Sequence, residues 1–321
     1  MAIQKTEVVA IGEILIDFAS IGQAENGYPL MQANPGGAPV NYLAALSKYG
    51  FKTSMIGKVG NDVFGNLLEN TLLSKGIGTK GIIKSDEYYT TLAFVTFDSE
   101  GDRSFSFARK PGADASLSFS EVDTGLIASA GVLHFGTVSM TGMPASDATK
   151  KAVMWAKDNG KLISFDPNLR EPLWDDMKQA RDAMLWGLKM ADVVKISDNE
   201  VGFLWDTGYK EGAEKIINEY GVKLVFVTLG PSGCYFLNRN GGGQVEALKV
   251  RPVDTTGAGD IFAGSAMSRL LKYGRSPDEL TADELYEIVR FASAAASLST
   301  EKQGGLDSIP DEEEVLCHLP G

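Results

Sequence analysis

Val8-Val9-Ala10-Ile11-Gly12 is a short apolar run that ends in glycine, a pattern typical of a strand buried in a parallel sheet. Further runs of this kind follow at residues 53–56, 132–135, 162–165, 193–196 and 224–229. Between many of them, apolar residues recur three and four apart, as in amphipathic helices, at 41–49, 62–75, 146–159 and 212–220. This alternation predicts an α/β fold with a mostly parallel central sheet, flanked by helices on both faces.

Two stretches, 14–34 and 90–110, lie outside this alternation. The second is typical of a hairpin, because strand-like residues 91–97 and 103–107 flank the polar turn 98–102. We expect both stretches to form a small β-sheet lid, and residues 1–321 to form a single domain. Residues 240–243 are expected to be a loop tip, and residues 311–314 a solvated acidic turn.

The charge balance excludes some classes of partner. The 321 residues include 30 Lys and Arg against 42 Asp and Glu, so the net charge is 30 − 42 = −12. Such a surface repels nucleic acids and anionic lipid, so neither is an expected partner, and a nucleotide site would need its own local cations. The chain has two cysteines in no CxxC pair and no apolar run of membrane-spanning length, so we expect a cytoplasmic protein.

A glycine-rich segment carries the clearest chemistry: Asp254-Thr255-Thr256-Gly257-Ala258-Gly259-Asp260. It precedes a small, apolar stretch, residues 261–267, that is typical of a buried helix. The Gly-Ala-Gly run would then lie at a helix N-terminus, where free N–H groups and the helix dipole favour an anion. A carboxylate there is unexpected for anion binding alone, but it suits a base beside a transferring phosphoryl group. An ordinary glycine-rich turn with an N-terminal charge is the alternative.

A second segment is Asn34-Pro35-Gly36-Gly37-Ala38-Pro39-Val40-Asn41. Two adjacent glycines before a helix permit close backbone contact with a ligand. Asn41 supplies both a donor and an acceptor, which suits sugar hydroxyls. Taken alone, the segment is more typical of a plain loop with Asn near a helix start.

Together, the segments 36–41 and 254–260 resemble the two hallmark motifs of the PfkB, or ribokinase-like, family of carbohydrate kinases. The resemblance extends, in the family's order, to residues 12–17, 165–170, 195–200 and 228–233. The ordered set spans nearly the whole chain, which makes it far more specific than any single motif. It implies a ribokinase-like fold, a sugar and ATP as small-molecule partners, magnesium as cofactor and a homodimer formed through the lid.

The resemblance also implies a role for each matched position. Asp260 resembles the catalytic base, beside an anion hole made by the backbone of Gly257, Ala258 and Gly259. The sugar site corresponds to Asp17, Gly36, Gly37 and Asn41. The nucleotide phosphates and magnesium correspond to Asp166, Asn168, Arg170, Lys195 and Glu200, with Asp166 and Glu200 as the expected metal ligands. The turn that accommodates ATP corresponds to Thr228, Gly230 and Gly233.

Two features leave alternatives open. Many family members carry Asn-x-x-Glu where this chain has Ser197-Asp198-Asn199-Glu200, so the role of Ser197 is undecided. The resemblance also places a potassium loop beside the anion hole, corresponding to Asp254, Thr256, Gly304 and Ser308. A plain surface loop is an equal alternative there.

The hairpin at 90–110 resembles that of fructokinases more than that of ribokinases, so fructose, phosphorylated at a primary hydroxyl, is the expected acceptor. Asp17 favours neutral hydroxyls and would repel a sugar acid. Arg109, at the end of the hairpin, is a further candidate substrate residue that acts the other way, because a guanidinium suits a carboxylate. An unpaired Arg109 in the pocket would favour a sugar acid, whereas an Arg109 that is paired or points to the rim would favour fructose.

Other activities remain alternatives. Within enzymes these are a kinase for 2-keto-3-deoxygluconate and one for ribose or a riboside, and outside them a non-catalytic sugar sensor on the same fold. The chain lacks G-x-x-x-x-G-K-[ST], H-R-D and a G-x-G-x-x-G after the first strand, which argues against P-loop, protein-kinase and dinucleotide-binding proteins. With only His134 and His318, a histidine-based triad or zinc site is not expected.

Overall fold

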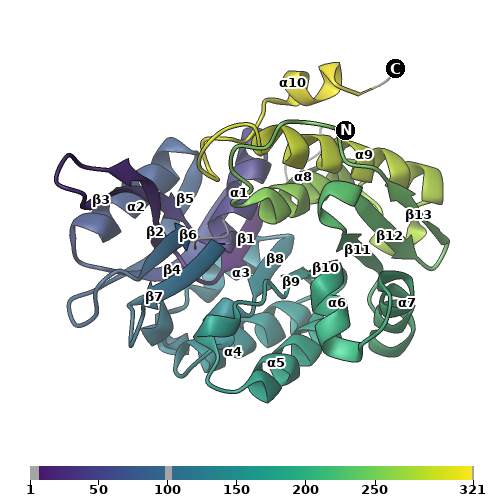
Figure 1. The fold of residues 1–321 in the computed structure, drawn as a ribbon. Coiled ribbons are helices and arrows are strands. Elements are labelled where there is room, and N and C mark those ends of the chain that lie inside the picture. Colours follow the sequence, from purple (N-terminus) through teal and green to yellow (C-terminus); the bar gives the residue numbers. More distant parts are fainter. Residues whose placement is uncertain (1–6, 98–102, 320–321) are drawn as a thin grey trace.

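The computed structural model describes residues 7–97 and 103–319, and its core is a nine-stranded sheet (Figure 1). Its strands are β1 (Val8–Ile11), β4 (Thr53–Gly60), β5 (Ile77–Ser85), β8 (Val132–Gly136), β9 (Leu162–Asp166), β10 (Val193–Ser197), β11 (Leu224–Thr228), β12 (Cys234–Asn238) and β13 (Gly241–Val245). The spatial order is β13-β12-β11-β10-β9-β8-β1-β4-β5. Strand β12 pairs antiparallel with both β11 and β13, while all other neighbouring strands pair parallel. The predicted mostly parallel α/β sheet is confirmed.

Helices cover both faces of this sheet, because buried parallel strands need apolar partners above and below (Figure 1). One face packs against α1 (Ala38–Lys48), α2 (Val63–Ser74), α8 (Ala258–Tyr273) and α9 (Ala282–Ser299). The other packs against α3 (Thr124–Ser129), α4 (Ala145–Asp158), α5 (Met177–Met190), α6 (Asp198–Trp205) and α7 (Tyr209–Tyr220). Strand β1 lies between the two layers, and all four of its residues are fully buried.

A four-stranded sheet stands off the main body (Figure 1). It consists of β2 (Leu15–Gln23), β3 (Pro29–Gly36), β6 (Leu92–Phe97) and β7 (Arg103–Ala108), in the order β3-β2-β6-β7. Strands β2 and β6 run parallel, with Ile16 opposite Leu92, and the outer pairs are antiparallel. The two stretches expected to form the lid therefore do form one sheet. The predicted turn at 98–102 lies outside the described residues.

Two local expectations are wrong. Residues 240–243 are not a loop tip, because Gly241 begins edge strand β13. A Cβ on Gly243 would lie 2.8 Å from the ring of Phe236, so glycine permits close packing on β12. Residues 311–314 are not a turn but the start of α10 (Glu312–Cys317), where acidic residues complement the helix N-terminus and Glu312 pairs with Arg269.

The topology brings the predicted site residues to one edge of the sheet. Strands β1, β9, β10 and β11 are parallel, so their carboxyl ends lie on the same side, and ligands bind at this side of open α/β sheets. No helix in the described part of the chain has both the length and the apolar character needed to cross a membrane.

Candidate active site

The N-terminus of α8 faces this edge of the sheet. Its N-cap, Gly257, has φ 77 and provides no side-chain cap, so the first N–H groups of the helix have no partner within it. Ala258 N–H makes only a long contact, 3.4 Å, with the carbonyl of Thr255. A Cβ on Gly257 would lie 2.9 Å from Nδ2 of Asn41, so glycine lets this turn approach α1. The result is a backbone cradle with a positive dipole end, suited to an anion.

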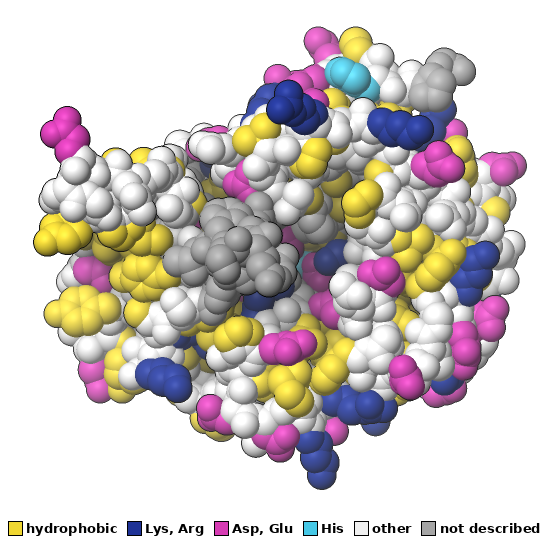
Figure 2. All heavy atoms as spheres, in the orientation of Figure 1, with side chains coloured by type: hydrophobic (Ala, Val, Ile, Leu, Met, Phe, Trp, Pro, Cys, Tyr) yellow, Lys and Arg dark blue, Asp and Glu magenta, His cyan; other side chains and the backbone are white. Residues whose placement is uncertain are grey.

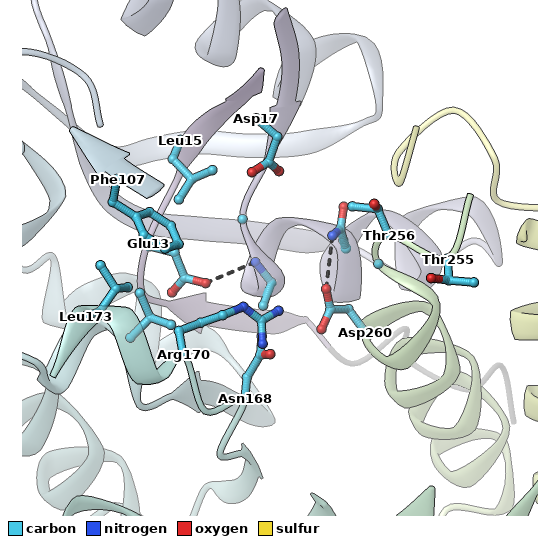
Figure 3. A pocket seen from close by; sticks show the side chains of 15 residues that line it. Glu13, Leu15, Asp17, Phe107, Asn168, Arg170, Leu173, Thr255, Thr256 and Asp260 are labelled. Carbon is cyan, nitrogen blue, oxygen red and sulfur yellow. Dashed lines mark hydrogen bonds between the residues drawn. The ribbon is translucent and has the colours of Figure 1, made fainter. Parts of the chain in front are cut away.

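Asp260 lies in the first turn of α8 and is buried, with 8% of its surface exposed. Asn41 Nδ2 donates to its Oδ2 at 3.0 Å (Figure 3). Burial raises the pKa of Asp260 above its ordinary value, while the charge of Lys195 and the hydrogen bond from Asn41 act to lower it. A carboxylate with a raised pKa accepts a proton more readily than a surface one, which is the property a general base needs.

A cavity of about 720 Å³, open to solvent, lies between the lid and α8 (Figure 3). Eight of its lining residues belong to the set predicted from the sequence: Asp17, Gly37, Asn41, Asn168, Arg170, Thr256, Gly257 and Asp260. Gly36 lines an adjoining hollow, and a Cβ there would collide with the carboxylate of Asp17. Burial raises the pKa of Asp17 to about 6, despite the opposing charge of Arg170.

Glu13 lines the cavity and lies in the segment 12–17, but the sequence did not predict a role for it. It follows β1, is 4% exposed, and accepts a hydrogen bond from Ala38 N–H through Oε1 at 3.0 Å (Figure 3). Ala38 is the first residue of α1, whose N-cap Gly37 has no side-chain hydrogen bond. Glu13 therefore caps the helix that carries Asn41. The signal available in the sequence was an acidic residue directly after the first strand.

Lys195, in the middle of β10, and Asp166, at the end of β9, form a buried ion pair. Lys195 Nζ lies 3.0 Å from Oδ2 and 3.2 Å from Oδ1 of Asp166. Burial raises the pKa of Asp166 to about 7, although Lys195 acts to lower it. Both residues therefore lie beside the site, but as partners of each other.

Ser197 is the N-cap of α6, and its hydroxyl and the carboxylate of Glu200 form a reciprocal capping box. Glu200 Oε2 accepts from Ser197 N–H at 2.8 Å, and Oε1 accepts from Leu169 N–H at 2.8 Å. Glu200 thus fixes the loop that carries Asn168 and Arg170. This gives Ser197 a structural role, which the sequence had left open.

Asp166 and Glu200, the expected metal ligands, do not form a metal site made of protein ligands alone. Among the described residues, no three His, Cys, Asp or Glu side chains cluster as ligands. Magnesium commonly binds through one or two carboxylates, with water and substrate phosphates as its other ligands. Asp166 is paired with Lys195, and both oxygens of Glu200 accept backbone hydrogen bonds, so the two carboxylates fit a metal held mainly by water and phosphate oxygens.

Asp254 connects the two segments of the expected potassium loop. Its Oδ1 accepts from Thr256 N–H at 2.9 Å and its Oδ2 accepts from Gly304 N–H at 3.1 Å. Ser308 is 1% exposed, and its N–H donates to the carbonyl of Gly304 at 3.2 Å. All four residues therefore belong to one hydrogen-bonded unit beside the start of α8.

The expected ATP turn follows β11. Gly230 and Gly233 adopt left-handed conformations, with φ 54 and 92, and a Cβ on Gly233 would collide with the carbonyl of Val245. Thr228 is at the end of the strand. These residues share the carboxyl edge of the sheet with Lys195 but do not line the cavity beside Asp17.

Arg109 does not line the cavity, contrary to its expected place in the sugar site. Its Nε donates to Asp114 Oδ2 at 2.8 Å, its Nη1 to Thr141 Oγ1 at 2.6 Å, and its Nη2 to the Val138 carbonyl at 3.1 Å. The side chain is 5% exposed. Because Asp114 follows only five residues later, the chain turns back and neutralises the guanidinium.

Comparison with known proteins agrees with this geometry. The model of the pfkB family of carbohydrate kinases matches residues 5–312. Fructokinase-1 of Zea mays is 39% identical over 324 residues, covering 98% of both chains. The crystal structure of Xylella fastidiosa fructokinase with bound ATP has a TM-score of 0.89, with 29% identity and 98% of both chains covered.

Vibrio cholerae fructokinase, crystallised with fructose, ADP and calcium, has a TM-score of 0.87 at 29% identity, covering 98% of this chain and 99% of that one. A double mutant of that enzyme was crystallised with fructose, ADP and potassium. The Xylella structure thus contains ATP, and the two Vibrio structures contain fructose, ADP and a calcium or potassium ion. The chain belongs to the pfkB family of carbohydrate kinases.

Proposed function

We propose that this protein transfers the γ-phosphoryl group of ATP to a primary hydroxyl of fructose, giving fructose 6-phosphate and ADP. The observation that carries the proposal is Asp260, a buried carboxylate in the first turn of α8 that faces the cavity beside an uncapped helix N-terminus. A non-catalytic sugar sensor would have no need of a base at that point.

In the proposed reaction, Asp260 accepts the proton of the attacking hydroxyl. The hydroxyl oxygen forms a bond to the γ-phosphorus as the bond to the bridging oxygen of ADP breaks. The N–H groups at Gly257, Ala258 and Gly259 stabilise the negative charge on the phosphoryl oxygens. Asn41 fixes the carboxylate of Asp260 through its 3.0 Å hydrogen bond, so the base is held in place before the substrate arrives.

Sugar binding in this proposal depends on Asp17, Asn41 and the backbone at Gly36 and Gly37. Asp17 accepts hydrogen bonds from neutral hydroxyls and repels an acidic sugar. Arg109 would act in the opposite sense, but its guanidinium is bound to Asp114 and lies behind the cavity wall. The pairing of Arg109 favours fructose over 2-keto-3-deoxygluconate.

The nucleotide would extend from the anion hole along the carboxyl edge of the sheet, past Asn168, Arg170 and Lys195, to the turn at Thr228, Gly230 and Gly233. Asp166 and Glu200 would hold magnesium, chiefly through water and phosphate oxygens. When bound, the metal neutralises phosphate charge. Potassium would bind at the loop formed by Asp254, Thr256, Gly304 and Ser308, and would order the start of α8 without touching the sugar.

A coupled assay of ADP release with fructose, 2-keto-3-deoxygluconate and ribose tests the acceptor. We expect the highest kcat/KM with fructose. Preference for either other substrate would refute the acceptor while leaving the kinase activity intact, and ATP-dependent turnover of none would favour the sensor. Equal activity in potassium and in a large organic cation, at matched ionic strength, would refute the potassium site.

A further inference from the structure

The ion pair between Arg109 and Asp114 is among the most buried in the described part of the chain. The exposed side-chain fractions are 5% for Arg109 and 1% for Asp114. The pair lies where the lid hairpin joins the body, because Thr91, directly before β6, donates its hydroxyl to Asp114 Oδ1. Arg109 directly follows β7 and bonds to the loop at Val138 and Thr141.

Residues next to the ion pair line the sugar cavity. Val138, whose carbonyl accepts from Arg109, lines the cavity, as does Phe107, two residues before Arg109. The charges of Asp114 and Arg109 both reach the cavity residue Glu13, one raising its pKa and the other lowering it, beneath the larger effect of burial. The charge state of the pair therefore bears directly on the cavity.

Other charged groups decide what an additional cation would do. Among the described residues that line the cavity, Glu13, Asp17 and Asp260 are acidic, and Arg170 is basic. This balance suits a neutral polyol and disfavours an anionic sugar. An unneutralised guanidinium behind Val138 would shift the balance toward a carboxylate ligand.

We propose that Asp114 is a specificity-determining residue: by binding Arg109 it cancels a positive charge at the cavity wall, and the site thereby selects a neutral sugar over a sugar acid. Asp114 acts through Arg109 and touches no substrate, so it is a positioning residue. The inference rests on the proposed function for its choice of sugars, but its direction depends only on charge.

The first test is Asp114→Asn. The amide keeps an acceptor for the Thr91 hydroxyl but presents N–H groups to Arg109 Nε–H, so the ion pair is lost while the shape is retained. The ratio of kcat/KM for 2-keto-3-deoxygluconate to that for fructose should rise by about tenfold or more, because the charge acts across a poorly screened protein wall. The inhibition constant of 2-keto-3-deoxygluconate against fructose should fall in the same sense.

Arg109→Gln provides the opposite perturbation. It leaves the carboxylate of Asp114 without its cation, so the same ratio should fall below that of the wild type. The double variant Asp114→Asn/Arg109→Gln removes both charges and should return the ratio to within about threefold of the wild type. A purely structural role for the pair would lower both activities together and leave the ratio unchanged.

The matched control is Glu7→Gln. Glu7 is also a buried, ion-paired carboxylate, 7% exposed and bound to Lys52, but it lies just before β1, at the end away from the cavity. In Glu7→Gln, the ratio of kcat/KM for 2-keto-3-deoxygluconate to that for fructose should equal the wild-type ratio. Circular dichroism and melting temperature establish that each variant is folded.

An unchanged ratio in folded Asp114→Asn, or a rise in Arg109→Gln, would overturn the inference. Should Asp114→Asn fail to fold, Arg109→Gln still decides the question through its opposite expected shift. Failure of the proposed function would be seen separately, as a wild-type preference for another sugar. The effect of Asp114→Asn could then still be measured, as a shift in kcat/KM from that preferred sugar toward its sugar acid.

Discussion

Replacing Asp260 with asparagine should remove most turnover while preserving the fold and both binding sites. The carboxylate is buried and makes one described side-chain hydrogen bond, from Asn41 Nδ2 at 3.0 Å. An asparagine oxygen can accept that same bond, so the contact between α1 and α8 survives. What is lost is the capacity to take a proton.

The expected magnitude follows from that single loss. General-base catalysis typically contributes about 10²- to 10⁴-fold, equivalent to roughly 3–5 kcal/mol in the barrier. Removal of the charge should leave binding of fructose and ATP within a few-fold of wild type, because the cradle of N–H groups and the Asn41 bond remain. The loss should therefore appear in kcat, with little change in KM.

The assay is ADP release by purified Asp260→Asn under saturating substrates, with calorimetric titration of nucleotide as the binding control. Asp123→Asn, which removes a surface carboxylate that caps α3, controls for the purification and should retain full kcat. A kcat of Asp260→Asn within about tenfold of the wild type would refute the role of this residue as base.

The other predictions concern the residues around the base. Glu13→Ala should lower the free energy of unfolding by about 1 kcal/mol, because the first N–H of α1 loses its cap, and should lower kcat because Asn41 is then less well placed. Glu13→Gln, which can still accept that hydrogen bond, should restore both quantities. Equal melting temperatures and equal kcat values for the two variants would contradict this role. The KM for fructose should rise as pH falls below about 6, where the buried Asp17 becomes protonated and its carboxylate no longer accepts hydrogen bonds from the sugar hydroxyls. If Asp17→Asn showed the same dependence of KM on pH as the wild type, Asp17 would be excluded as its cause. Glu200→Gln should raise the magnesium concentration for half-maximal rate, because it weakens the hold on Leu169 and removes a nearby charge; a magnesium titration that matches that of the wild type would count against the site.

The sequence predicted the sheet, the lid and the catalytic motifs because each depends on local pattern. Buried parallel strands require continuous apolar runs, and the turn before α8 requires glycine at a left-handed position. Such requirements are visible in a few consecutive residues. Residues 240–243 were wrongly predicted to be a loop tip because glycine is typical of turns. In the structure, glycine lets edge strand β13 pack on Phe236.

Side-chain pairing could not be predicted in the same way. Arg109 and Asp114 are five residues apart in an irregular segment, and no periodicity indicates whether the guanidinium faces the sugar or turns back. The cap that Glu13 provides for α1 spans 25 residues of sequence. Both depend on how the lid and helix dock on the sheet, which is a tertiary property. The sequence therefore identified which residues lie near the site better than it identified what each one contacts.

The position of Lys195 explains how a chain with net charge −12 can provide a site for a polyanionic nucleotide. Burial acts to lower the pKa of this lysine, but Asp166, Glu200 and Asp260 together raise it, so it remains charged. A Cβ on Gly259 would lie 3.0 Å from Lys195 Nζ, which places the ammonium against the first turn of α8. The cation therefore adds its field to the N–H cradle and also acts to keep Asp260 ionised. Basic and acidic side chains are both visible in the hollow of this face (Figure 2). Anion binding at such a site depends on local cations and a helix N-terminus, and the acidic outer surface opposes it only weakly because solvent and salt screen distant charges.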